Sequence, residues 1–380
     1  MMSEWKECKL GDIVTLEYGK GLKDYRNTGG NYDVFGTNGK IGLTNKFLCD
    51  KPSVIIGRKG AYREVHLAKL PFFVIDTAFY TKILIQNLEN LFLYYWLKNI
   101  DINEMDSGSA IPSTSRDEVY DLDILLPPLS EQKAIASVLS SLDAKIDLLH
   151  RQNKTLEAMA ETLFRQWFVE EANKNWDYVT LGDFVNLING VSYKSSELNP
   201  SKNALVTLKS FDRNGGFRTD VFKEFTGKFK ENQIVNENDI VVAHTDITQD
   251  AEIIGNPILV VKDPNYDKMI ISMDLVKVVS KYDWLSTEFL YQMMRNREFK
   301  YHCLGHSNGS TVLHLSKSAI PSYEFFLPPI EIIKEFTDGV NLILNKKFQN
   351  IAQIRTLEKL RDMLLPKLMS GDIRVKYENN

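Results

Sequence analysis

Two stretches of the chain carry apolar residues at alternating steps of three and four, which is the spacing of one helix face. The first forms a seam of nearly five heptads: Ile135, Leu139, Leu142, Ile146, Leu149, Asn153, Leu156, Ala160, Leu163 and Trp167. The second is less regular: Phe336, Val340, Leu344, Phe348, Ile351, Ile354, Leu357, Leu360, Leu364 and Leu368. Such a pattern predicts two long helices that pair as a coiled coil. About forty residues at about 1.5 Å each give a rod of roughly 60 Å.

The flanking residues indicate where these helices begin and end. Each follows a double proline, Pro127-Pro128 or Pro328-Pro329. Ser130 is suited to be the N-cap of the first helix. The second helix has "IEI" where the first has "SEQ", so its start is less defined. We expect Pro366 to kink or end its last turns and the helix to stop near Ser370-Gly371.

A long helix with one apolar stripe needs a partner. The obvious partner of each helix is the other, and an antiparallel pair would form a spacer between two globular units. Asn153 lies in the seam, where it either sets the register of the pair or faces outward through drift of the seam.

An internal repeat accompanies the two helices. "WKECKLGDIVTLEYGKG" from Trp5 matches "WDYVTLGDFVNLINGVS" from Trp176 at an offset of 171 residues. "SGSAIPSTSRDEVYDLDILLPP" matches "NGSTVLHLSKSAIPSYEFFLPP" at an offset of 201, which places Ser109 over Ser310. The middle parts share almost no sequence. We infer one frame used twice, with about thirty extra residues in the second copy.

Each copy mixes short strand patterns such as "SVIIG" and "DIVVAH" with amphipathic helices such as "LENLFLYYWLKNI" and "STEFLYQMMRNREF". This predicts an α+β fold in which each globular domain is a mixed sheet with flanking helices, and the two domains are separated by the antiparallel coiled coil.

Composition is that of a soluble protein, with 43% hydrophobic and 25% charged residues in 380. The three cysteines are far apart and indicate neither a disulfide framework nor a cysteine zinc site, which fits a reducing cytoplasm. No segment is apolar enough to predict a membrane span or a signal peptide.

The net charge of -4 hides a segregation of charge along the chain. Residues 19–70 hold ten basic and four acidic residues, and residues 101–123 hold seven acids and one base. The second copy repeats this, with eight bases and four acids in 194–230 and six acids without Lys or Arg in 231–252. Local basic fields favour anion binding, although solvated surface charge is the plainer alternative.

Glycine-rich loops in these regions combine amide, hydroxyl, basic and aromatic side chains, a mixture that contacts phosphates and base edges. Any single loop could equally be an ordinary polar hairpin. The candidate DNA-binding residues of the first copy are Thr37, Asn38, Lys40, Arg58, Lys59, Tyr62, Arg63 and Ser109. Those of the second copy are Lys209, Arg213, Asn214, His244, Thr245, Thr248, Gln249 and Ser310.

The order of domains and helices, together with "VIIGRKGAYREVHLA", "PFFVIDTAFY", "LPPLSEQ", "GSAIPSTS" and "LLPKLMSGDIRV", resembles the specificity subunit of type I restriction-modification systems over essentially the whole chain. The resemblance implies target recognition domains at residues 1–126 and 172–327, each reading one half of a bipartite asymmetric DNA site. It implies spacer helices at residues 127–171 and 328–380.

The same resemblance implies a non-catalytic subunit that holds no cofactor. Its expected partners are double-stranded DNA, modification subunits that bind S-adenosylmethionine and methylate adenine, and a restriction subunit that uses ATP and Mg²⁺ to cut DNA.

Enzymatic alternatives have little support in the motifs. "DPNY" at Asp263–Tyr266 departs from the methyltransferase motif and is expected to be a surface turn. The chain contains no phosphate-binding G-x-x-x-x-G-K-[ST] loop and no Pro-Asp pair of a nuclease motif. The spacing of His302, Cys303, His306 and His314 fits no common zinc pattern, so no metal site is predicted. An orphan bipartite DNA-binding regulator remains an alternative that sequence does not exclude.

Overall fold

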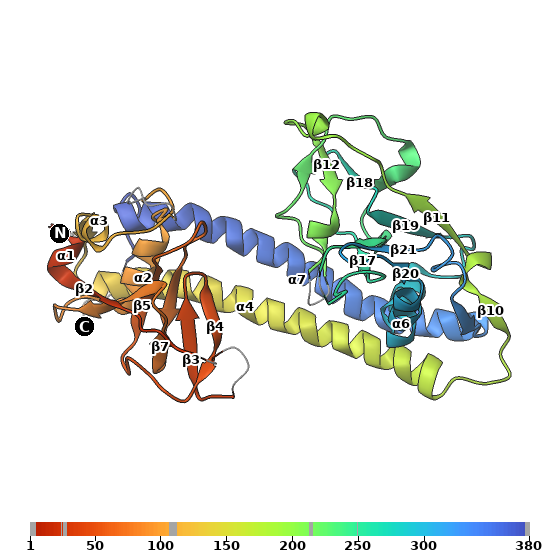
Figure 1. Cartoon of the computed structure of the whole chain (residues 1–380), viewed down its shortest axis with the longest axis horizontal. Coiled ribbons are helices and arrows are strands. Elements are labelled where there is room, and N and C mark those ends of the chain that lie inside the picture. The colour runs from red at the N-terminus through yellow and green to blue at the C-terminus, as the bar shows by residue number, and fades with distance from the viewer. Residues whose placement is uncertain are drawn as a thin grey trace. The chain divides into compact units, whose positions relative to one another are not determined.

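The computed structural model describes residues 5–23, 25, 29–105, 112–212, 216–248 and 250–376. The chain folds into two compact units, Met1–Leu149 with Gln353–Asn380 (unit 1) and His150–Ala352 (unit 2). The division falls inside the two long helices, α4 (Leu129–Arg165) and α7 (Ile330–Ser370), so each unit contains part of both. Figure 1 labels the elements along the chain.

Unit 1 contains a four-stranded sheet of order β2-β8-β5-β6 and a three-stranded sheet of order β4-β3-β7, with β1 paired to β9. The β3–β7 pair is parallel and the others are antiparallel. The strands are β1 (Lys6–Lys9), β2 (Val14–Tyr18), β3 (Tyr32–Gly36), β4 (Gly39–Thr44), β5 (Ser53–Gly57), β6 (Val65–Ala68), β7 (Phe72–Val74), β8 (Ala78–Ile83) and β9 (Asp123–Leu126). The helices are α1 (Leu10–Ile13), α2 (Asn90–Lys98) and α3 (Arg116–Tyr120).

Unit 2 contains sheets of order β11-β19-β15-β17, β13-β12-β18-β14 and β16-β21-β20, with β10 paired to β22. Its longer strands are β10 (Tyr178–Thr180), β11 (Val185–Asn189), β12 (Asn203–Val206), β15 (Ile240–Ala243), β17 (Pro257–Leu259), β18 (Lys268–Ile271), β19 (Leu275–Ser280), β21 (Leu313–Leu315) and β22 (Glu324–Phe326). Two-residue strands are β13 (Lys223–Glu224), β14 (Ile234–Val235), β16 (Thr245–Asp246) and β20 (Ser307–Asn308), and the short helices are α5 (Thr287–Arg295) and α6 (Arg297–Gly305).

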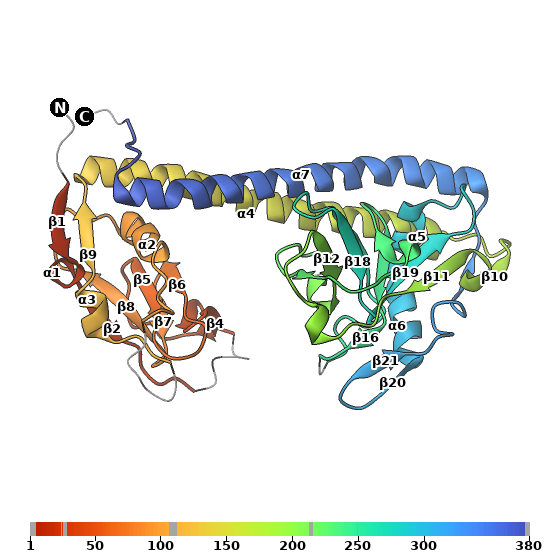
Figure 2. The same ribbon diagram turned by 90° about the horizontal axis from the view of Figure 1, so that it is seen from above.

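The central strands are buried on both faces because the sheets have a layer on each side. In β5, Val54 and Ile56 join the core beneath α2, whereas Ile55 faces a second cluster with Phe35 and Phe72. Strand β15 alternates in the same way between two cores. Figure 2 shows α2 between the sheet of unit 1 and α4.

The internal repeat is confirmed by main-chain hydrogen bonds. Gly19 and Lys20 donate to the carbonyls of Ala78 and Val74, and Gly190 and Val191 donate to those of Leu275 and Ile271. A Cβ on either glycine would lie within 2.0 Å of a carbonyl oxygen, of Ile75 or of Ser272, which explains why glycine occupies both positions.

The divergent middle parts also correspond, although their sequences do not align. Ile75 donates its amide hydrogen to the carbonyl of Phe35 (2.9 Å), and Ser272 donates to that of Val206 (2.9 Å). Strands β3 and β12 are therefore equivalent, each paired in parallel with the next strand of its sheet. The extra residues of the second copy lie mainly between β12 and β18, a stretch that includes the two-residue strands β13 and β14.

The two long helices begin and end close to their predicted positions. Helix α4 starts at Leu129, so Ser130 lies inside the helix. The prediction that Ser130 is the N-cap is therefore wrong. The carbonyl of Pro128 accepts from the amides of Glu131 and Gln132, and the carbonyl of Pro329 accepts in the same way at the start of α7. Helix α7 continues through Pro366 and ends at Ser370, before Gly371 with φ +82°.

Within each unit, the segments of α4 and α7 pack antiparallel. In unit 1, Ile146 and Leu149 share a cluster with Ile354 and Leu357. In unit 2, Asn350 Nδ2 donates to Asn153 Oδ1 at 2.9 Å. Asn153 thus makes a polar contact within the helix pair, while its effect on register stays a prediction.

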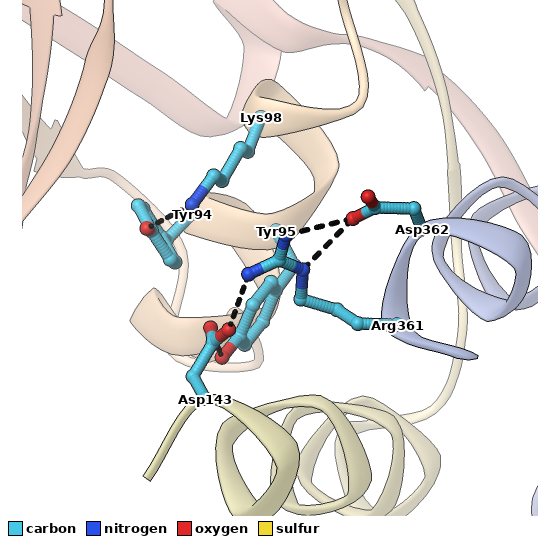
Figure 3. Close-up of polar contacts among 6 residues, drawn as sticks. All are labelled: Tyr94, Tyr95, Lys98, Asp143, Arg361 and Asp362. Atoms are coloured by element: carbon cyan, nitrogen blue, oxygen red, sulfur yellow. Dashed lines mark hydrogen bonds and ion pairs between the residues drawn. The ribbon is translucent and has the colours of Figure 1, made fainter. Parts of the chain in front are cut away.

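A polar cluster fastens α2 to both long helices of unit 1 (Figure 3). The hydroxyl of Tyr95 donates to Asp143 Oδ2 on α4 at 2.7 Å, and Arg361 Nη1 on α7 donates to Asp143 Oδ1 at 3.1 Å. Burial, followed by the bond to Asp143, raises the pKa of Tyr95 above its usual value, so the phenol remains a donor at neutral pH.

Two residues of the "LPPLSEQ" motif at the start of α4, Glu131 and Gln132, are also held by hydrogen bonds. Gln132 is fully buried and bonds the backbone around Asn87 and Glu89. Glu131 accepts from the indole of Trp5 at 3.1 Å and is paired through both oxygens with Arg374. None of the helices within the described ranges is long and apolar enough to cross a membrane.

Candidate nucleic-acid interface

In unit 1, the β3–β4 turn and the loop after β5 lie next to each other. The hydroxyl of Thr37 donates to the carbonyl of Lys59 at 2.7 Å. Thr37 therefore joins the turn to the loop, whereas Asn38 beside it is exposed. Lys40 is also exposed and forms an ion pair with Asp33 at 2.6 Å.

Two guanidinium groups stack on one exposed aromatic ring at this edge. The Cζ atoms of Arg58 and Arg116 lie 4.8 Å and 4.4 Å from the centroid of Tyr18, whose side chain is 43% exposed. Arg58 also lies 5.6 Å from the ring of Phe79 and donates to the carbonyl of Asp76 at 3.2 Å. The stacking restrains both half-buried guanidinium groups next to the exposed ring. Guanidinium groups can bind phosphates and base edges.

Sequence reasoning missed Tyr18 and Arg116. Arg116 is the single basic residue of the acidic segment 101–123, and that isolation was the signal available.

The rest of the 58–63 loop divides into exposed and buried residues. Lys59 is exposed and Tyr62 is 77% exposed. Arg63 is only 2% exposed, and its backbone and Nη2 donate to Asn103. The prediction that Arg63 reaches DNA does not fit this placement, because its guanidinium is turned into the domain.

Arg58 and His244 occupy equivalent positions in the two units. The amide of Thr114 donates to the carbonyl of Arg58 at 2.9 Å, and the amide of Leu315 donates to that of His244 at 2.8 Å. The amides of Arg58 and His244 donate in turn to Thr77 and to the corresponding Asp274, each at 2.8 Å. The same main-chain frame thus carries a different side chain in each unit.

The electrostatics of these two positions differ. Burial, with His314 and Lys317 nearby, lowers the pKa of His244 despite the opposing effect of Asp274. A neutral imidazole donates one hydrogen bond and accepts another, whereas the guanidinium of Arg58 only donates. The equivalent positions therefore suit different hydrogen-bonding patterns.

The segment after His244 is built around the fully buried Asp246. Its carboxylate accepts from the amide and hydroxyl of Thr248 and from the amides of Ile253 and Ile254, at 2.6–2.8 Å. Burial alone would raise the pKa of Asp246, but these hydrogen bonds lower it below the usual value. Thr245 is buried as well, so Thr245 and Thr248 shape the loop and do not present free hydroxyls at its surface.

Two further candidates of unit 2, Lys209 and Ser310, lie within the described residues. Lys209 is exposed in the turn after β12, and Ser310 is exposed at the tip of the β20–β21 hairpin. Ser109, Arg213, Asn214 and Gln249 lie outside the described residues.

A family model described as the type I restriction modification DNA specificity domain matches residues 2–158 and 173–358. The chain belongs to this family.

Two curated relatives are similar over most of their length. One is the specificity subunit of the type I restriction enzyme MjaIX from Methanocaldococcus jannaschii, 24% identical over 91% of this chain and 85% of the relative. Another is the HindI specificity subunit from Haemophilus influenzae, 25% identical over 98% of this chain and 100% of the relative. A solved S subunit from M. genitalium has the same fold, with a TM-score of 0.62, 19% identity, and coverage of 97% of this chain and 96% of the other.

The histidine cluster of this type I specificity family member is held by ring packing and a backbone contact. The rings of His302 and His306 lie 4.2 Å apart, and His302 Nε2 lies 2.8 Å from the carbonyl oxygen of Ala319. Burial raises the pKa of the Cys303 thiol to about 12. In the described part of the chain, no group of three or more His, Cys, Asp or Glu side chains is arranged to hold a metal ion. Asp263–Tyr266 forms the turn predicted for it, with Asp263 accepting from the amide of Asn265.

Proposed function

We propose that each unit reads one half of a bipartite asymmetric DNA site, through the loops at the matched edges. The observation that carries this proposal is the equivalence of Arg58 and His244. One main-chain frame presents different side chains at the same position, which is what a subunit needs to read two different half-sites with two copies of one fold.

In this function the chain supplies recognition and no chemistry. Its modification subunits would bind S-adenosylmethionine and methylate adenine, and a restriction subunit would use ATP and Mg²⁺. Glu131 and Gln132, fixed by Arg374 and by the backbone before α2, keep the helix pair attached to the unit 1 domain, and the helix pair is the surface that we assign to these partners.

Methylation mapping tests this function. The chain expressed with its modification subunits should give methylated adenines in one bipartite motif, and the purified chain alone should transfer no label from S-adenosylmethionine to DNA. Transfer by the chain alone would contradict the non-catalytic role. If the chain bound DNA and never co-purified with a modification subunit, an orphan DNA-binding regulator would replace this proposal.

A further inference from the structure

Unit 2 contains a polar cavity that the recognition loops do not use. Its volume is about 600 Å³, within the range of small-ligand sites. It is lined by the C-terminal part of α4, the start of β17, the end of α5 and the first turn of α6: Glu161, Phe164, Arg165, Asn256, Pro257, Gln292, Met294, Arg295, Asn296, Arg297 and Lys300. All of these residues belong to unit 2.

The deepest polar group of this cavity has unused hydrogen-bonding capacity. Gln292 is only 1% exposed, yet neither atom of its amide has a hydrogen-bond partner among the described residues. Arg295 Nη1 beside it is likewise buried without a partner in the described structure. Buried donors without partners are destabilising, so the cavity is suited to a ligand that accepts hydrogen bonds.

Comparison with unit 1 shows why Gln292 lacks a partner. The sequences of α2 and α5 place Tyr95 at the position of Gln292, and Tyr94 and Lys98 at those of Tyr291 and Arg295. Tyr95 is satisfied by Asp143 on α4. The partner is missing from unit 2 because the residue of α7 that matches Asp143 in the repeat is Leu344.

The charge of the lining favours an anion. Arg165, Arg295, Arg297 and Lys300 line the cavity with one acid, Glu161, and Arg165 is paired with Glu170 at 3.1 Å. Arg295 is partly neutralised by Glu161 at 3.6 Å and by Glu157 at 4.0 Å. Lys300 Nζ donates to the carbonyls of Ala251, Glu252 and Ile254. Its ammonium group therefore adds positive charge to the cavity but has no remaining hydrogen to donate to a ligand.

Helix α6 adds backbone donors to these cations. Its N-cap residue, Asn296, makes no capping hydrogen bond with its side chain, and the amides of the first turn have no acceptor within the helix. A helix N-terminus of this kind favours phosphate or carboxylate groups. The side-chain carbonyl of Gln292 needs a donor as well. A phosphomonoester with a protonated oxygen supplies one, whereas a backbone phosphodiester has no such oxygen at neutral pH and would engage only the amide of Gln292.

We propose that this cavity binds a phosphate group, with Gln292, Arg295 and the N-terminus of α6 as its hydrogen-bond donors and Arg297 at its mouth. The phosphate could belong to a free phosphomonoester or to the backbone of a nucleic acid. The proposal does not depend on the bases that the recognition loops read.

The test uses the full chain and inorganic phosphate without DNA. Phosphate is titrated at constant ionic strength against chloride, with calorimetry and the thermal midpoint as readouts. We expect saturable heat and a rising midpoint. Gln292→Leu and Arg297→Glu should each weaken phosphate binding at least about tenfold, since each removes or opposes a donor or charge worth more than about 1.4 kcal/mol.

Lys98→Glu is the matched control, because Lys98 is exposed and lines the equivalent cavity of unit 1. It should leave phosphate binding unchanged. A wild-type chain that responds to phosphate as it does to chloride, or two cavity variants that bind as tightly as wild type, would overturn the proposal. Arg297 is exposed, so Arg297→Glu is informative even if Gln292→Leu fails to fold.

A second arm separates the two sources of phosphate. With saturating duplex DNA present, unchanged phosphate binding indicates a free phosphomonoester. Loss of phosphate binding, with a salt slope of DNA binding lowered by about one in Arg297→Glu, indicates a backbone phosphate.

Discussion

At the scale of single residues, the exposure of a basic side chain depends on its place in the fold more than on its residue type. Arg58, Lys59 and Arg63 are three basic residues of one loop, yet Lys59 is exposed, Arg58 is half-buried, and Arg63 is buried and bonded to Asn103. Sequence patterns identified the loop correctly as polar and basic. They could not separate the three side chains, because burial here depends on a contact forty positions away.

We expect Arg58→Ala to weaken recognition of one half-site and His244→Ala to weaken recognition of the other, each by about 1–3 kcal/mol where a base contact is lost. Affinity of the complex for duplexes altered in one half-site at a time measures this. Lys69→Ala is the control, since Lys69 is exposed beyond β6, at the opposite end of the sheet from Arg58. Equal losses for both half-sites in either variant would contradict separate reading.

Asp246 gives a pH-dependent prediction. Its folded pKa is lowered, so its contribution to stability is present at neutral pH and is lost as pH falls through the folded pKa, below 3.8. Asp246→Asn should destabilise the chain at pH 7 by about 1–3 kcal/mol, because an amide cannot accept all four hydrogen bonds. Thermal midpoints of wild type and variant should converge as the pH is lowered past that folded pKa. Asp250→Asn, exposed in the same loop, should show no such gap.

At the scale of elements, the long helices were the most predictable part of the structure. Their heptad pattern extends over many residues, so one residue that departs from the pattern does not change the prediction. Pro128 and Pro329 mark the starts of the helices within a residue or two. The equivalence of β3 and β12 was missed because it is made by main-chain hydrogen bonds, which leave no shared side chains to align. The stacking of Arg58 and Arg116 on Tyr18 was missed because the three residues are distant in sequence.

Tyr95 on α2 donates to Asp143 on α4, so we expect these two residues to be energetically coupled. Tyr95→Phe should cost about 1–2 kcal/mol, since it leaves Asp143 short of one buried donor, and the same change in an Asp143→Asn background should cost less. Denaturation of the four chains of this cycle gives the coupling energy. Tyr94→Phe, one residue away, removes a hydroxyl whose hydrogen-bond partner among the described residues is the exposed Lys98, and it should be nearly neutral. Additive effects of Tyr95→Phe and Asp143→Asn would contradict the coupling.

At the scale of the whole chain, the two helices are predicted to set the distance between the two DNA half-sites. A test of this prediction has to lengthen the helices themselves. Residues added between Glu170 and Asn175 would not do so, because that segment lies beyond the end of α4. Seven residues added after Leu149 and seven after Ala352 would lengthen both helices while keeping the heptad phase.

The added heptads contribute about 10.5 Å, or about three base pairs of DNA. Methylation mapping should find unchanged bases in both half-sites and a non-specific spacer about three base pairs longer. A seven-residue insertion in α4 alone is the control, and it should abolish function by breaking the pairing of the helices. An active double variant with the original spacer would show that something else sets the distance.

The matched hydrogen bonds of the two units have a consequence for how such a protein can evolve. They join amide hydrogens to carbonyl oxygens, atoms that every residue except proline provides. Substitution at Arg58 or His244 therefore leaves these bonds in place, and new side chains can be tried at the same spot with little loss of stability. Mutational tolerance is concentrated where preference for a DNA sequence arises, so a lineage can acquire a new target without first rebuilding the domain that reads it.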